Sequence, residues 1–135
     1  MPSERQAPDS AAEWRNRAHS DLRLARARIE GVYLEDLCYH AQQAAEKALK
    51  ALFISRGWRF PYVHDLADLV TRLEAGGIGI PATVRDAVAL TEFAVSGRYP
   101  ALDEPVSEAE YQTALARADA VVLWVETEAG KGGQT

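Results

Sequence analysis

The 135-residue sequence contains a single cysteine, Cys38, so it cannot form a disulfide within the chain. It has no run of 18 or more apolar residues, and this predicts that no helix spans a membrane. Residues 1–9 are polar, include two prolines and lack the apolar stretch of a secretory signal. These absences predict a cytoplasmic protein. The place of Cys38 beside an apolar stripe of its expected helix favours a small core residue rather than a nucleophile.

Positive charge is also scarce, because 15 Lys and Arg residues stand against 20 Asp and Glu, which gives a net charge of −5. Broad, sequence-independent binding of nucleic acid needs a basic surface, so this class is disfavoured, although local basic patches remain open. The three histidines, His19, His40 and His64, form neither an H-x-x-x-H pattern nor a Cys/His cluster. We therefore expect no metal site and no cofactor.

The sequence is rich in helix-forming residues, and its apolar residues recur at the spacing of amphipathic helices. No segment alternates apolar and polar residues over several positions, so no strand is expected. The pattern predicts an all-α, up-and-down bundle of about five helices, in which the first two form a long antiparallel hairpin. We expect the helices over residues 11–30, 34–56, 65–75, 82–95 and 108–129. They form one domain over residues 10–129, between flexible tails at 1–9 and 130–135.

Several residues mark the ends of these helices. Ser10 with Glu13, and Ser107 with Glu110, have the spacing of capping boxes, and Gly57 is placed to end the second helix. Either His64 or Asp65 would cap the third helix. At the ordinary α-helical period, the first helix would bury a face that continues to Ile29. The fourth helix would turn its inward face toward the core through Val84, Ala87, Val88, Thr91, and Ala94 or Val95.

The segment from Cys38 to Leu52 has the most informative pattern in the chain. One face of this expected helix is apolar and rich in small side chains, which lets a neighbouring helix approach closely. The residues of that face are Leu37, Ala41, Ala44, Ala48 and Leu52. A polar ridge lies beside it at spacings of three, four and three residues, and it consists of His40, Gln43, Lys47 and Lys50. His and Gln are less usual than Glu and Lys on a merely solvated face.

This segment resembles the signature helix of the HEPN family (higher eukaryotes and prokaryotes nucleotide-binding domains). Further motifs carry the resemblance: Asp21-Leu22 in the first helix, His64-Asp65-Leu66 at the third, and Gly-Arg-Tyr-Pro at residues 97–100. The resemblance covers about residues 13–128. It implies a helical nucleotide-binding domain, in a family that includes both ribonuclease toxins and non-catalytic members.

The ribonuclease motif of the family is incomplete here. HEPN toxins cleave RNA without metal by means of an Arg that is followed four to six residues later by a His. Arg98 stands at the corresponding place, but Tyr-Pro-Ala-Leu-Asp-Glu follows it. Arg59 and His64 have the right spacing, yet they lie in an expected loop that contains Pro61. The resemblance therefore favours a protein that is not an enzyme, with no catalytic residue assigned.

A ligand site is predicted around the loop that contains Arg98. The guanidinium of Arg98 suits a phosphate, and Tyr99 suits stacking on a base. The polar ridge and the start of the third helix would complete the site. The predicted ligand-binding residues are Arg98, Tyr99, His40, Gln43, Lys47, His64 and Asp65. An equally weighted alternative is that His40 and Gln43 pair within the fold and that Asp65 is only a helix cap.

The leading functional hypothesis is a non-catalytic nucleotide- or polynucleotide-binding HEPN module. The resemblance implies a minimal nucleotidyltransferase subunit as its partner, in substrate binding or as half of a toxin–antitoxin pair. One alternative is a metal-independent RNase toxin that works through Arg98 and a different base. Another is a structural dimeric adaptor. We expect a homodimer because Val121, Leu123 and Trp124 widen the apolar surface of the last helix beyond one face.

Overall fold

The computed structural model describes residues 4–94 and 105–132. Within these ranges the chain forms five α-helices, one 3₁₀-helix and no strand, which confirms the expected all-α fold. The elements are α1 (Ala11–Arg26), α2 (Leu34–Ser55), α3 (Leu66–Ala75), α4 (Ala82–Asp86), the 3₁₀-helix η1 (Ala87–Phe93) and α5 (Glu108–Gly132). The motif at residues 97–100, with Arg98 and Tyr99, lies outside the described residues.

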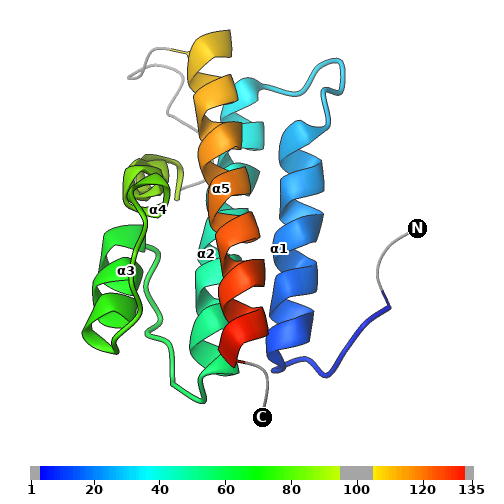
Figure 1. Ribbon diagram of the computed structural model, residues 1–135. Helices are drawn as coiled ribbons and strands as arrows, with labels where there is room; N and C mark the ends of the chain where they lie inside the picture. The colour runs from blue at the N-terminus through cyan, green and yellow to red at the C-terminus, as the bar shows by residue number, and fades with distance from the viewer. Residues whose placement is uncertain (1–3, 95–104, 133–135) are drawn as a thin grey trace.

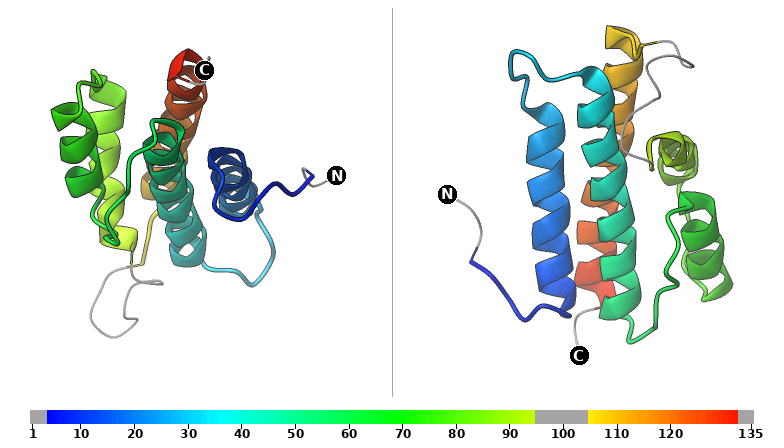
Figure 2. Two further views of the ribbon diagram at one scale, coloured as in Figure 1. Left: turned by 90° about the horizontal axis from the view of Figure 1, so that it is seen from below. Right: turned by 180° about the vertical axis from the view of Figure 1, so that it is seen from behind.

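The helix α2 is the centre of the bundle. It forms an antiparallel hairpin with α1, and α5 packs against both and runs in the same direction as α2 (Figure 1). Seen from below, α2 and α5 lie between α1 on one side and α3, α4 and η1 on the other (Figure 2). Two neighbouring helices that run in the same direction need a long connection. Between α2 and α5 that connection includes α3, α4 and η1.

The ends of the helices follow the local signals of the sequence. The Ser107 hydroxyl accepts from the Glu110 N–H at 3.1 Å, and the Glu110 carboxylate accepts from the Ser107 N–H at 3.0 Å. Ser10 likewise accepts from the Glu13 N–H at 3.1 Å. The Glu13 carboxylate, however, accepts from the Gln6 N–H at 2.8 Å, so this capping box is not reciprocal.

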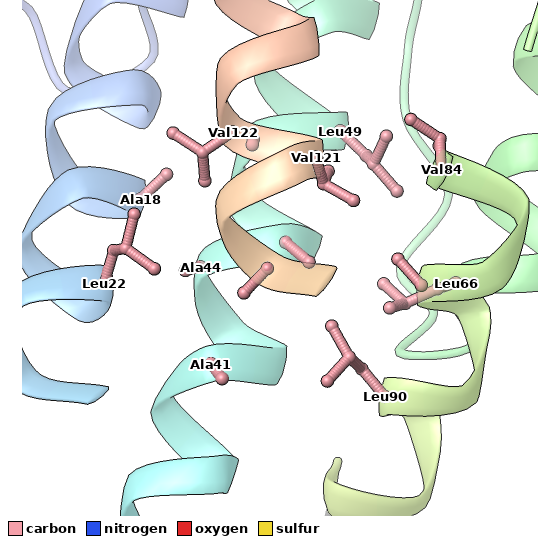
Figure 3. Close-up of a cluster of buried hydrophobic side chains, with 14 of the residues drawn as sticks. Ala18, Leu22, Ala41, Ala44, Leu49, Leu66, Val84, Leu90, Val121 and Val122 are labelled. Atoms are coloured by element: carbon pink, nitrogen blue, oxygen red, sulfur yellow. The ribbon is translucent and has the colours of Figure 1, made fainter. Parts of the chain in front are cut away.

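Small residues of α2 form the middle of the core (Figure 3). All five residues of the predicted apolar face are at most 5% exposed, and Cys38 is fully buried. Ala41 and Ala44 lie among larger side chains of the neighbouring helices, which include Leu22 of α1 and Val121 of α5. Because alanine side chains are short, the two flanking helices can pack closely against α2.

The first helix is shorter than the sequence pattern predicts. It ends at Arg26, and Ile29 is 60% exposed rather than part of the buried face. At this end of α1 the chain makes two contacts with α5 instead of continuing as a helix. The Tyr111 hydroxyl donates to the carbonyl oxygen of Ala25 at 2.6 Å, and Arg28 donates to both carboxylate oxygens of Glu108 at 2.6 and 2.7 Å.

The expected fourth helix is also different, because only Ala82–Asp86 is α-helical and Ala87–Phe93 forms a 3₁₀-helix. Its buried residues are spaced by three, the period of a 3₁₀-helix. They are Val84, Ala87, Leu90 and Phe93, whereas Val88 and Thr91 are only partly buried. Val88 and Thr91 nevertheless lie toward the core, because Val88 packs against the core cluster and the Thr91 hydroxyl accepts from the Leu66 N–H at 3.0 Å.

The last helix continues to Gly132, three residues beyond the predicted end. Only part of its wide apolar surface is buried within the chain, because Val121 is buried whereas Leu123 is 67% exposed. None of the helices in the described ranges has the length and apolar composition that a membrane crossing requires.

Candidate functional site

Two groups of polar side chains lie along α2. The first, here called the hairpin cluster, joins α1 to α2 and consists of Asp21, His40 and Lys47. The second, here called the loop cluster, joins α2 to the segment before α3. It consists of Gln42, Glu46, Lys50 and His64. In each group a nearly buried carboxylate accepts hydrogen bonds from a lysine and a histidine.

In the hairpin cluster, Asp21 binds both of its partners with separate oxygens. Its Oδ1 lies 2.9 Å from Nδ1 of His40, and its Oδ2 accepts from Nζ of Lys47 at 2.6 Å. Because a carboxylate can only accept, Nδ1 of His40 carries the proton in this arrangement. The side chains of His40 and Lys47 are 33% and 27% exposed. They therefore stand side by side at the surface, with their orientation set by one carboxylate.

In the loop cluster, Glu46 is the acceptor at the centre. Its carboxylate accepts from Nε2 of Gln42 and from Nζ of Lys50, each at 2.9 Å. Nδ1 of His64 lies 3.0 and 3.2 Å from the two carboxylate oxygens. The side chains of Glu46 and Lys50 are both almost fully buried, whereas that of His64 is 69% exposed.

The hydrogen bonds around Glu46 decide its charge. Burial by itself would raise the pKa of this carboxyl, but the hydrogen bonds from Gln42, Lys50 and His64 together hold the pKa below its ordinary value. Glu46 is therefore ionised at neutral pH. Among the described residues, no buried side-chain nitrogen or oxygen lacks a hydrogen-bond partner. Such a fully paired polar network favours a rigid arrangement.

The structure divides the predicted polar ridge between these clusters. His40 and Lys47 meet at Asp21, whereas Lys50 belongs to the loop cluster and is 5% exposed. Gln43 lies next to the loop cluster, because its Nε2 donates to Oε1 of Gln42 at 2.7 Å. The ridge is thus not one open polar face.

The remaining predicted site residues lie at the start of α3 or outside the described ranges. His64 belongs to the loop cluster, and Asp65 caps α3 by accepting from the Ala67 N–H at 3.0 Å. Arg98 and Tyr99 lie outside the described residues. The ligand-binding role of these residues stays a prediction.

Sequence reasoning missed two central residues, Gln42 and Glu46, and treated Asp21 only as part of a motif. Gln42, Glu46 and Lys50 recur every four residues, which places them on one side of a helix. That spacing was the available signal, although it does not reveal that His64 completes the group from another segment.

Two hollows exist elsewhere on the described surface. One, of about 250 Å³, lies between η1 and α5 and includes Phe93 and Arg117 in its lining. The other, of about 400 Å³, lies at the connection between α1 and α2 and includes Arg28 and Val32. Neither is lined by a residue of the two clusters.

Comparison with known proteins agrees with the motifs and the fold. The sequence profile of the HEPN domain matches residues 11–128. The crystal structure of TT1696 from Thermus thermophilus is similar, with 30% identity, a TM-score of 0.74, and coverage of 87% of this chain and 97% of that chain. The archaeal HEPN homologue ST0689 has 25% identity, a TM-score of 0.71, and coverage of 90% and 98%. No curated protein sequence matches significantly. This chain belongs to the HEPN domain family.

Proposed function

We propose that this HEPN domain is a non-catalytic module that binds a nucleotide or polynucleotide, together with a minimal nucleotidyltransferase partner. The observation that carries the binding proposal is the hairpin cluster. One carboxylate, that of Asp21, holds His40 and Lys47 next to each other at the surface. The ammonium of Lys47 has three N–H groups, so two remain for a ligand after the bond to Asp21.

Orientation by a buried acceptor makes these donors suited to an anion. A side chain that is already held in place loses less conformational entropy when it binds. Lys47 is a phosphate-binding residue type, and the Nε2 of His40 is not used by Asp21. We infer that a phosphate group of the ligand binds beside Lys47 and that Arg98 supplies a second contact.

The proposal assigns no catalysis because the Arg–His motif of the family's ribonucleases is incomplete. The sequence has no His within six residues after Arg98. General acid–base catalysis contributes about 10²–10⁴-fold, so a chain without it should cleave RNA poorly. Incubation with single-stranded RNA and tRNA in EDTA tests this point. Cleavage that Arg98→Ala abolishes would favour the RNase toxin instead.

Calorimetric titration with a panel of nucleotides and oligonucleotides tests the binding proposal. Lys47→Ala and Arg98→Ala should each weaken binding by about ten- to a hundredfold, since a hydrogen bond to a charged group contributes about 1.5–3 kcal/mol. Lys131→Ala is the matched control, because this exposed lysine of α5 also pairs with a carboxylate, that of Glu128. If no ligand binds the parent, or if both variants bind like the parent, the proposal is wrong.

The partner requires a separate experiment. We expect that a minimal nucleotidyltransferase encoded beside this chain forms a complex with it, which sedimentation of the mixture would detect as a faster species. In the toxin–antitoxin form of the proposal, expression of one protein alone would slow growth and the other would restore it. The absence of a complex at tens of micromolar would contradict the partnership but not ligand binding.

A further inference from the structure

The segment between α2 and α3 exposes aromatic and basic side chains at the surface. Tyr62 is 94% exposed, the highest value among the large exposed hydrophobic residues of the described chain. Arg59 is also exposed and makes no ion pair with the described residues. The side chain of His64 is 69% exposed. We call residues 59–64 the aromatic loop.

The aromatic loop is held against the bundle by Phe60. The Phe60 ring packs edge-on against Trp14 of α1, with centroids 5.0 Å apart and planes at 62°. The ammonium of Lys50 lies 5.2 Å from the centroid of the same ring. Tyr62 packs edge-on against Phe60, at 5.8 Å and 65°. This contact orients the Tyr62 ring, and because Tyr62 is 94% exposed the ring stays accessible for stacking.

The loop cluster holds the end of the aromatic loop. Nδ1 of His64 binds the buried Glu46 carboxylate, and the carbonyl oxygen of His64 accepts from Nε2 of Gln42 at 3.3 Å. Nε2 makes no hydrogen bond with the described residues, and the side chain is 69% exposed, so Nε2 can bind a ligand. The side chain and backbone of His64 are thus both held in place by buried groups.

We propose that the aromatic loop binds single-stranded RNA, with a base stacked on Tyr62 and the backbone in contact with Arg59 and His64. This inference rests on the proposed function and names its ligand class. Stacking on an aromatic face requires an unpaired base, so a duplex does not fit.

The net charge of the chain gives the proposal a distinctive salt dependence. For single strands, the logarithm of the binding constant falls by about 0.7 per contacted phosphate for each tenfold rise in salt. Because the chain carries a net charge of −5, we expect few phosphate contacts and a slope of about −1 to −2. Stacking on Tyr62 would then contribute a large share of the affinity.

Fluorescence anisotropy with a labelled RNA of about eight nucleotides tests this site. Tyr62→Ala should weaken binding by about 5- to 150-fold, the range that alanine substitution gives for one stacked base. Tyr33→Ala is the matched control, because Tyr33 is 73% exposed and precedes α2 at the end opposite to the aromatic loop. This control should bind like the parent. A labelled duplex of the same sequence should bind at least about tenfold more weakly than the single strand.

Charge variants test the backbone contacts. Arg59→Ala should weaken binding and make the salt slope shallower by about 0.7, whereas Arg23→Ala, which removes an exposed arginine of α1, should change neither. His64→Asn can keep a donor toward Glu46 but lacks Nε2, so weaker RNA binding with an unchanged melting temperature would support a direct contact.

The variants also separate this inference from the proposed function. If Lys47→Ala and Arg98→Ala lose RNA binding while Tyr62→Ala and Arg59→Ala bind like the parent, the aromatic loop is not the site and the proposed function stands. If the parent binds neither RNA nor any nucleotide, both are wrong. Equal binding of Tyr62→Ala and Tyr33→Ala overturns the inference in either case.

Discussion

Removal of Glu46 should destabilise the fold more than removal of an ordinary surface carboxylate. In Glu46→Leu the side chain keeps a similar size, but the ammonium of Lys50 loses the partner that it binds at 2.9 Å. The Lys50 side chain is 6% exposed, so it cannot turn to solvent without a rearrangement. Breaking a buried pair by removing one partner costs about 3–5 kcal/mol.

This cost is large relative to the stability of a domain of this size. Total unfolding free energies are about 5–15 kcal/mol. With an unfolding entropy of about 2.1 cal/mol/K per residue, the 135-residue chain should lose about 10–18 °C in melting temperature. Urea unfolding followed by circular dichroism and tryptophan fluorescence measures the free energy directly.

A second substitution distinguishes a buried charge from a general packing defect. Lys50→Met in the Glu46→Leu background removes the unpaired ammonium, and we expect the double variant to recover at least about 2 kcal/mol. Gln42 would keep its bond to the His64 carbonyl in both variants. A loss below about 1 kcal/mol in Glu46→Leu, or no recovery in the double variant, would refute this reasoning.

The pH dependence of the same variant provides a further check. The folded pKa of Glu46 is lowered, so its stabilising contribution is present above the ordinary value of 4.5 and is lost as the pH falls through the folded pKa. The difference in stability between the parent and Glu46→Leu should therefore decrease in acid. A constant difference from neutral pH down to the acid transition would contradict the ionised state of Glu46.

Three further predictions concern other parts of the molecule. Gly76→Ala should destabilise the fold by about 1–3 kcal/mol, because a Cβ there would lie 2.5 Å from the Trp58 ring. Gly79→Ala is the control, since a Cβ there meets no atom within 4 Å, and equal melting temperatures of the two variants would contradict this prediction. The hydrogen bond from Arg28 lowers the pKa of Glu108 from 4.5 to about 2, so Glu108→Gln should flatten the fall of stability between these pH values in acid denaturation. Sedimentation should give twice the chain mass of 14.8 kDa, whereas a monomer at tens of micromolar would contradict a homodimer.

Local patterns in the sequence determined much of the secondary structure. Ser107 and Asp65 cap helices as predicted because a side-chain oxygen needs only its own neighbouring N–H groups. Gly57 ends α2 at a φ of +75°, a conformation that glycine adopts without strain. The alanine-rich face of α2 was equally readable, since helical period alone decides which residues share a face.

Tertiary structure decided what each polar side chain contacts. The sequence spacing placed His40, Lys47 and Lys50 on one ridge, but the partner carboxylates divide them between Asp21 and Glu46. Helix periodicity cannot predict this division, because Asp21 comes from another helix and the bend of the chain before α3 brings His64 to Glu46. The same reason explains the early end of α1, where contacts with Tyr111 and Glu108 replace another helical turn. Contacts between distant segments depend on how the helices pack against one another. A local pattern describes one helix at a time and therefore cannot predict those contacts.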